Sequence, residues 1–265
     1  MKRTHKGGGA ASSTNLREYK TLKRMTPHPN VIRLHDSFSF EKDLYFVMEY
    51  MDQGNLYQLI KHRRETHCLL TTLEVRSIIR QILTALAHLH QQGIFHRDLK
   101  PENLLIGRNL VIKLADFGLA RDIKSKPPYT EYVSTRWYRA PEVLLHSTDY
   151  SCPIDMWAVG AIFAELVTLR PLFPGRSEID QLYRICKVLG SPKPHTTISS
   201  GRGFALKRRP RHSHPLATSA SLSAIDVLAK QAPIEDDAVT PAEQEWSDGV
   251  RLARKIGFDF PPVSL

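Results

Sequence analysis

Apolar residues recur at steps of three and four between positions 71 and 92, a period that predicts an amphipathic helix. Thr71 and Glu74 have the spacing of a capping box, and Gly93 supplies a stop at the other end. We expect this stripe to be core and the helix to hold the segment that follows it. The stripe consists of Val75, Ile78, Ile79, Ile82, Leu83, Leu86 and Leu89.

Other stretches predict shorter elements on both sides of this helix. Residues 31–40 and 44–49 are rich in β-branched and aromatic side chains and predict two strands joined by a polar turn. The apolar runs 104–106 and 110–114 predict a second pair of strands. Further helices are expected at 16–25, at 55–64, from 154 onward and at 177–190. Residues 1–15 offer no apolar face and are expected to be disordered.

Chemically active side chains gather where the long helix meets the second pair of strands. Residues 96–103 spell HRDLKPEN, and the triplet DFG begins at Asp116. Strands with neighbouring ends would bring Asp98, Lys100, Asn103 and Asp116 to one point. Such a set suits phosphoryl transfer from MgATP to a hydroxyl, with Asp98 as the base and Lys100 beside the moving phosphate. Asn103 and Asp116 supply the hard oxygen ligands that Mg²⁺ prefers, although any one aspartate alone could be a helix cap or a turn residue.

The ordered motifs HRDLKPEN, DFG and APE, the last at 140–142, resemble the catalytic half of a eukaryotic Ser/Thr protein kinase. The segments 55–59, 127–135 and 169–175 narrow the resemblance to the CMGC branch of cyclin-dependent and MAP-kinase-like enzymes. The chain looks most like the group of male-germ-cell-associated and intestinal-cell (ciliogenesis-associated) kinases. This resemblance covers about residues 16–193 and implies an α+β bilobal fold, with ATP and Mg²⁺ as cofactors.

The resemblance assigns the nucleotide-binding residues of the small lobe. Met48 takes the gatekeeper position, backbone groups from Glu49 to Met51 would hydrogen-bond adenine, and Leu105 belongs to the same ATP site. Glu18 lies where kinases carry the regulatory helix glutamate that pairs with a lysine on the third strand. An ordinary exposed helix carboxylate is the alternative for Glu18.

Between the DFG triplet and position 135 the chain resembles an activation segment with a Thr-x-Tyr pair, Thr130 and Tyr132. Each phosphate would add about two negative charges. By resemblance, Arg97, Arg121 and Arg17 would bind phosphothreonine or order the loop around it. The alternative is an exposed loop whose hydroxyls have no function.

The next segment resembles the substrate-binding wall of the same branch. Thr135 would hydrogen-bond the catalytic aspartate. With Arg139 in place, the wall would favour substrates that have proline directly after the phosphoacceptor residue. Asp155 is expected to hold the backbone of the 96–98 turn as a structural residue. By the same resemblance, Glu142 would be a structural carboxylate that pairs with an arginine of the closing helices of the large lobe. We expect those helices, and hence that partner, to be missing from this sequence.

Two departures from the family pattern concern the ends of the resemblance. Neither the glycine-rich strand pair nor the strand with the phosphate-gripping lysine is recognised, and Lys2 is a poor substitute, so Glu18 is expected to lack a partner.

We expect residues 1–15 to be disordered, 16–50 a partial small lobe, 51–193 the large lobe, 194–245 a disordered insertion and 246–265 a truncated continuation of the large lobe. A docking module with impaired catalysis is therefore the alternative function.

Composition narrows the remaining classes of function. The 265 residues carry a formal net charge of +10, and no run of about 18 apolar residues or apolar signal core is present. Three scattered cysteines fit a reducing compartment, so a cytoplasmic or nuclear location is expected. The kinase resemblance implies protein substrates, and a monomer is expected. An upstream activating kinase is a further expected partner, whereas membrane and nucleic-acid partners are not. The basic cluster at 207–211 is either a nuclear-import or nucleic-acid patch or a solvated charge run.

Overall fold

The computed structural model describes residues 2–5, 10–41, 43–125, 135–190, 252, 253 and 256, with the backbone alone for 2–5 and 10–16. No helix among these residues is long and apolar enough to cross a membrane. The strands are β1 (Lys2–His5), β2 (Leu34–Phe40), β3 (Asp43–Met48), β4 (Ile94–Phe95), β5 (Leu104–Gly107), β6 (Val111–Leu114) and β7 (Arg121–Asp122). The α-helices are α1 (Ala10–Arg24), α2 (Leu56–Glu65), α3 (Thr72–Gln91), α4 (Pro141–Leu144), α5 (Pro153–Thr168) and α6 (Glu178–Leu189). Short 3₁₀ turns are η1 (Pro101–Asn103), η2 (Arg108–Leu110) and η3 (Phe117–Leu119).

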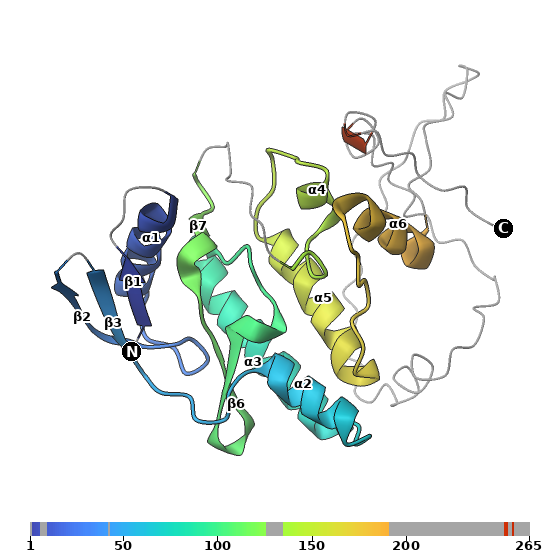
Figure 1. Ribbon diagram of the computed structural model, residues 1–265, viewed down its shortest axis with the longest axis horizontal. Coiled ribbons are helices and arrows are strands. Elements are labelled where there is room, and N and C mark those ends of the chain that lie inside the picture. Colours follow the sequence, from blue (N-terminus) through green and yellow to red (C-terminus); the bar gives the residue numbers. More distant parts are fainter. Residues whose placement is uncertain are drawn as a thin grey trace, which may run out of the picture.

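The N-terminal part is a three-stranded antiparallel sheet in the order β1-β3-β2, with α1 beside it, as Figure 1 shows in blue. The prediction of disorder was wrong for residues 2–5, because β1 pairs with β3 from Lys2 opposite Phe46 to His5 opposite Asp43, and for residues 10–15, which belong to α1. The helix predicted from residue 16 begins earlier, at Ala10. A strand at a sheet edge is held by backbone hydrogen bonds, so a search for apolar periodicity does not detect it.

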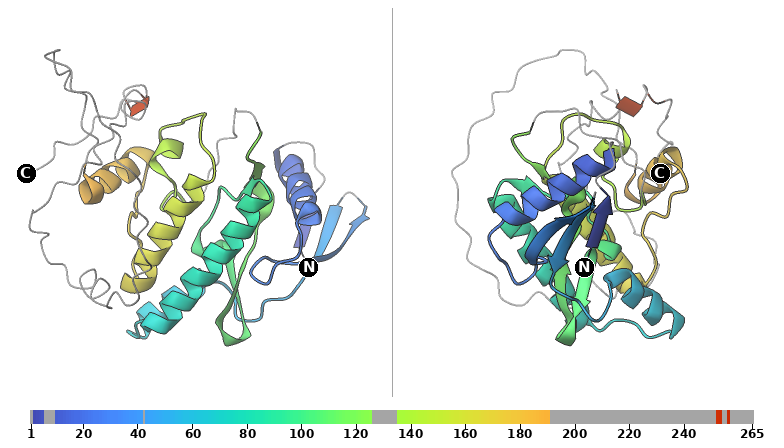
Figure 2. Two further views of the ribbon diagram at one scale, coloured as in Figure 1. Left: turned by 180° about the vertical axis from the view of Figure 1, so that it is seen from behind. Right: turned by 60° about the vertical axis from the view of Figure 1, so that its left-hand side comes forward.

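The larger part is built around the two long helices α3 and α5, which pack against each other and lie side by side in the left view of Figure 2. The predicted second pair of strands is present as the hairpin β5–β6, whose register sets Leu104 opposite Leu114. This register places Asn103 and Ala115, the residues just outside the pair, next to each other. The hairpin therefore brings the two predicted motifs together.

One apolar cluster joins the two parts. It includes Leu22 of α1 and Met25 directly after that helix, the buried face of α3, and Ile162 of α5. Five of the seven predicted stripe residues are buried, namely Val75, Ile78, Ile82, Leu86 and Leu89, and Ile79 packs partly buried against the cluster. Leu83 is 38% exposed, so its assignment to the core was wrong. The buried stripe is narrower than the apolar pattern of the sequence, because the elements packed against α3 cover one side of this helix only.

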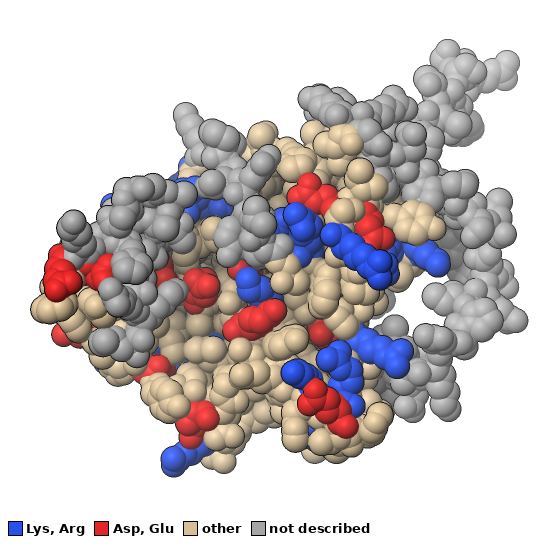
Figure 3. Space-filling view, in the orientation of Figure 1, with Lys and Arg blue, Asp and Glu red and all other residues tan. Residues whose placement is uncertain are grey.

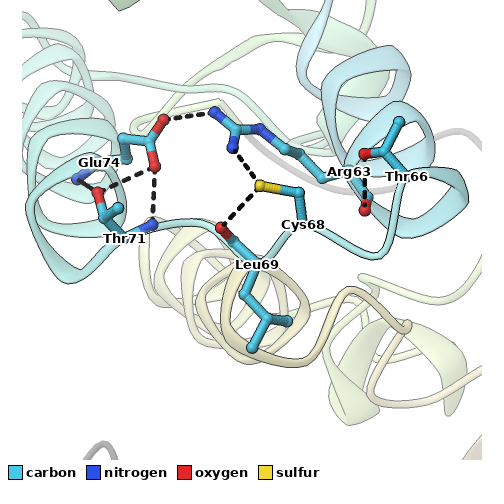
Figure 4. Close-up of polar contacts among 6 residues, drawn as sticks. All are labelled: Arg63, Thr66, Cys68, Leu69, Thr71 and Glu74. Atoms are coloured by element: carbon cyan, nitrogen blue, oxygen red, sulfur yellow. Dashed lines mark hydrogen bonds and ion pairs between the residues drawn. The ribbon is translucent and has the colours of Figure 1, made fainter.

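The start of α3 is fixed by the predicted capping box, which Figure 4 shows. The Thr71 hydroxyl accepts a hydrogen bond from the Glu74 amide at 3.2 Å, and Glu74 Oε2 accepts one from the Thr71 amide at 2.7 Å. The second oxygen of Glu74 lies 2.6 Å from the Arg63 guanidinium of α2. The hydrogen bond from the Thr71 backbone is the main cause that lowers the pKa of Glu74. The cap thus ties α2 to the helix that leads into residues 96–103.

Thr71→Ala should lower the free energy of unfolding by about 1 kcal/mol, because the amide of Glu74 loses its acceptor. Thr84→Ala is the matched control, since Thr84 is exposed in the middle of α3 and bonds only its own helix at Arg80. The control should change stability by less than about 0.5 kcal/mol. Urea unfolding of both variants measures the difference, and equal effects would contradict the capping role.

Candidate active site

The candidate catalytic residues lie on the loop between β4 and β5. Lys100 Nζ donates to Asp98 Oδ2 at 2.7 Å, and both side chains are mostly buried, with 13% and 11% exposure. Asn103 Nδ2 donates to the Asp98 carbonyl at 2.8 Å and to Asp98 Oδ2 at 3.2 Å. One carboxylate oxygen therefore contacts both an ammonium and a carboxamide.

Asp116 is brought to this group by the hairpin. The Ala115 amide donates to the Asn103 carbonyl at 2.9 Å, so the residue before Asp116 is bonded directly to Asn103. Asp116 itself is exposed and has a left-handed backbone, with φ 63°. His96 is fully buried, and its Nε2 donates to the Ala115 carbonyl at 3.0 Å, which links the same segment to the catalytic loop.

Asp155, at the start of α5, binds the backbone of the loop between β4 and β5. Its Oδ2 accepts a hydrogen bond from the His96 amide and its Oδ1 accepts one from the Arg97 amide, both at 2.9 Å. The side chain of His90 at the end of α3 also contacts Oδ2 at 2.9 Å. Arg97 has a φ of 74°, a conformation that costs a residue other than glycine about 1–3 kcal/mol. These contacts fix the backbone immediately before Asp98.

The donor set fits a magnesium ion. Among the described residues, both hydrogen bonds of the Asn103 side chain use its amide nitrogen, so its carbonyl oxygen is the atom suited to a cation. The exposed Asp116 carboxylate follows directly after the segment bonded to Asn103. A carboxylate and a carboxamide oxygen are hard ligands that match Mg²⁺.

The predicted nucleotide-binding residues lie at the end of β3, in the segment after it and on β5. Met48, Met51 and Leu105 are partly buried and pack against the main apolar cluster. Leu105 forms an isolated antiparallel bridge with Asn55, which places β5 beside the segment after β3. Glu49 extends this segment, and its amide donates to the Arg33 carbonyl at 3.0 Å.

Three predicted regulatory arginines lie near one another. Arg17 NH1 donates to the Gly118 carbonyl at 3.2 Å, and Arg97 NH1 donates to the Leu119 carbonyl at 3.3 Å. Burial lowers the pKa of Arg17, and the positive charges of Arg121 and Arg97 lower it further. The guanidinium groups of Arg121 and Arg97 are therefore close enough to repel that of Arg17. Thr130 and Tyr132 lie outside the described residues.

Glu18 of α1 is 2% exposed and takes part in a polar or electrostatic interaction. The expectation that it lacks a partner was therefore wrong, and so was the alternative of an exposed carboxylate. A charged side chain at this depth is stable only when it is compensated. The sequence missed this because the packing of α1 against η3 joins segments that lie far apart in the chain.

The predicted substrate-binding residues lie close to Asp98. Thr135 and Arg139 line a small cavity of about 20 Å³ together with Asp98 and Lys100. Arg139 NH1 is 4.0 Å from Glu178 Oε1 at the start of α6. The loop before α4 is thus adjacent to the catalytic loop.

A buried pair beside this wall was not predicted. The Tyr138 hydroxyl donates to Glu165 Oε2 at 2.6 Å, and the two residues are 6% and 3% exposed. Burial raises the pKa of both groups, and the Glu165 charge adds to the effect on Tyr138. An acidic residue within the otherwise apolar run of α5 was the signal available in the sequence.

The comparison with known proteins identifies this arrangement. The protein kinase domain family matches residues 1–230. The chain belongs to the protein kinase family. The serine/threonine-protein kinase ICK of Rattus norvegicus is 53% identical over 220 residues, which cover 81% of this chain and 34% of that protein. The serine/threonine-protein kinase MAK of Homo sapiens is 58% identical over 179 residues, which cover 68% of this chain and 28% of that protein.

A plant relative agrees with this assignment. Cyclin-dependent kinase F-4 of Oryza sativa is 51% identical over 224 residues, covering 81% of this chain and 47% of that protein. These relatives confirm the predicted resemblance to the CMGC branch, and the structure has the mixed α+β architecture expected for a kinase domain. The chain spans less than half the length of each of these relatives.

Glu142 of the kinase domain lies at the start of α4. Within the part of the chain that the structure describes, no ion pair joins it to a basic side chain. Burial raises the pKa of its carboxyl above the usual 4.5. The folded protein therefore holds this proton more tightly than the unfolded chain, and the resulting stability is present below pH 4.5 and lost as the pH rises through the folded pKa.

Glu142→Gln should consequently gain stability relative to the parent as the pH rises from 4 to 7, since glutamine stays neutral and avoids the cost of burying a charge. Denaturant unfolding of both proteins at several pH values measures the difference. A difference that does not change with pH, or one that favours the parent at pH 7, would show that Glu142 is stabilised in its charged form.

Proposed function

We propose that this chain is the catalytic part of a Ser/Thr protein kinase that transfers the γ-phosphate of ATP to protein hydroxyl groups. The observation that supports this is the grouping of Asp98, Lys100, Asn103 and Asp116 at one end of the β5–β6 hairpin. The names of the relatives support the choice of Ser and Thr as acceptors.

In the proposed reaction Asp98 accepts the proton of the substrate hydroxyl and orients its oxygen toward the phosphate. Lys100 Nζ, 2.7 Å from Oδ2 of the same carboxylate, would place a positive charge beside the phosphoryl group as it is transferred. Asn103 and Asp116 would hold Mg²⁺, which neutralises charge on the phosphates when bound. Backbone groups from Glu49 to Met51 would orient the adenine.

We extend the proposal to substrate preference. The position of Thr135 and Arg139 in one cavity with Asp98 supports a peptide-binding wall next to the base. By the resemblance of this segment to the CMGC kinases, the preferred acceptor is a Ser or Thr followed by proline. A peptide series with and without that proline tests this preference.

Regulation by the Thr-x-Tyr pair is part of the same proposal. The cluster of Arg17, Arg97 and Arg121 supports it, since three neighbouring cations favour a dianionic phosphate. An upstream kinase would supply the phosphate on Thr130 or Tyr132.

The environment and the partners of the protein are also proposals. All three cysteines, Cys68, Cys152 and Cys186, are free thiols, which supports a reducing compartment such as the cytoplasm or the nucleus. Acidic and basic side chains are interspersed over the face seen in Figure 3, a pattern that favours protein substrates over nucleic acid there. We propose a monomer.

Asp98→Asn should bind MgATP like the parent but lose about 10²-fold or more in phosphoryl transfer, because asparagine cannot accept the proton. Asp116→Ala should lose MgATP binding as well, since it removes a metal ligand. Calorimetry and transfer to a Ser-Pro peptide measure the two quantities. A folded parent chain that binds no MgATP would overturn the proposal in favour of a docking module, and normal turnover by Asp98→Asn would contradict the role of Asp98.

The double variant Thr130→Ala with Tyr132→Phe should lower kinase activity and leave thermal unfolding unchanged, because the arginine cluster would receive no phosphate. Activity is measured before and after treatment of the parent with a phosphatase, which should lower it to the level of the variant. Equal activity in the untreated parent and the variant would mean that this segment is not a phosphorylation switch.

A further inference from the structure

A little-exposed ion pair lies between the segment after β3 and the strand that leads to Asp116. Lys113 Nζ is 3.0 Å from Glu49 Oε2, and the two side chains are only 16% and 22% exposed. Both residues line a pocket of about 630 Å³ whose wall contains none of the four catalytic candidates. The two side chains therefore line a different pocket from the four catalytic candidates, although the backbone of Glu49 belongs to the predicted adenine-binding segment.

Each partner is anchored to a different end of the proposed nucleotide site. Lys113 is on β6, three positions before Asp116, and pairs across the hairpin with Leu105. Glu49 belongs to the segment whose backbone would bind adenine. Its second oxygen, Oε1, accepts a hydrogen bond from the Arg33 amide at 2.7 Å.

Backbone contacts complete a closed ring around this pair. The Ile32 amide donates to the Leu114 carbonyl, and the Leu114 amide donates to the Asn30 carbonyl, both at 2.9 Å. Segment 30–33 is thus bonded to β6 on one side and, through Arg33, to Glu49 on the other. The ion pair closes the ring, because it joins Glu49 directly to β6.

We propose that Lys113 and Glu49 are positioning residues that fix the adenine-binding backbone relative to the metal ligand Asp116. This inference rests on the proposed function. A nucleotide that contacts both ends needs them at a fixed separation, and the ion pair supplies the direct side-chain link between them. The charge of Lys113 also reaches His28: burial lowers the pKa of this imidazole, and the charges of His88 and Lys113 lower it further. Glu49 is the partner that compensates Lys113.

A purely structural tie would have a different signature. If the pair only stabilised the fold, its loss would lower the unfolding temperature and weaken all ligands alike. If it positions the two ends, its loss must weaken a ligand that spans both ends more than a ligand that touches one. MgADP and adenosine are such ligands, since adenosine lacks the phosphates that reach the metal.

The test uses the full chain as parent, Lys113→Met, Glu49→Gln, and the swapped double variant with Lys113→Glu and Glu49→Lys. Each single variant should weaken MgADP about fivefold and adenosine less than about twofold, and the swap should restore most of the MgADP affinity. Lys61→Met is the matched control, because Lys61 forms an exposed pair with Glu65 at 3.9 Å. It should change neither affinity.

Calorimetry gives the affinities, and thermal unfolding of the same proteins without nucleotide reports the stability of the pair. Equal losses for MgADP and adenosine, or single variants that bind MgADP like the parent, would overturn the positioning role while leaving the proposed function intact. Failure of the folded parent to bind MgADP would instead overturn the proposed function itself. Whether the parent chain binds MgADP therefore distinguishes failure of the proposed function from failure of the positioning role.

Discussion

Asp155 is 1% exposed, and its two carboxylate oxygens accept the backbone amides of His96 and Arg97. A carboxylate at this depth costs several kcal/mol unless hydrogen bonds replace its water, so its burial and the shape of the catalytic loop stabilise each other. The unusual backbone of Arg97 is held by one of these bonds. Because Asp98 follows directly, the direction of the carboxylate that we propose as the base depends on Asp155, a residue in a helix nearly sixty positions away. The position of α5, and hence the packing of α5 on α3, therefore determines the geometry of the site.

The second half of the site depends on register. In a hairpin a shift by one residue reverses the face of every side chain, so the pairing of Leu104 with Leu114 decides whether Asn103 can lie beside the DFG segment. The buried side chains at both ends of this pairing belong to the same apolar cluster as α1 and α3. Core packing on both sides of the hairpin consequently excludes the shifted registers, and a change in the core would displace the proposed metal ligands Asn103 and Asp116.

The sequence was sufficient for those features that local patterns control. The cap at Thr71 and the meeting of Asp98 with Asn103 could be predicted because spacing along the chain decides them. The strand β1 and the exposure of Leu83 could not, since both depend on what lies alongside in space. The bond from Tyr138 to Glu165 belongs to the same class, because its partners come from different elements. The burial of Glu18 was missed for a related reason, as a lone glutamate in a short helix carries no periodic signal.

The arginine cluster shows how such a site could be controlled. Neighbouring guanidinium groups repel one another. Burial lowers the pKa of Arg17, and repulsion from Arg121 and Arg97 lowers it further. Carbonyl oxygens of Gly118 and Leu119 offset part of the cost, but a carbonyl carries only a partial charge. A phosphate dianion would relieve the repulsion more fully. Arg97 belongs both to this cluster and, through its amide, to the loop held by Asp155. An anion bound by the Arg97 guanidinium would therefore contact the residue next to Asp98, which directly connects the proposed switch to the proposed base.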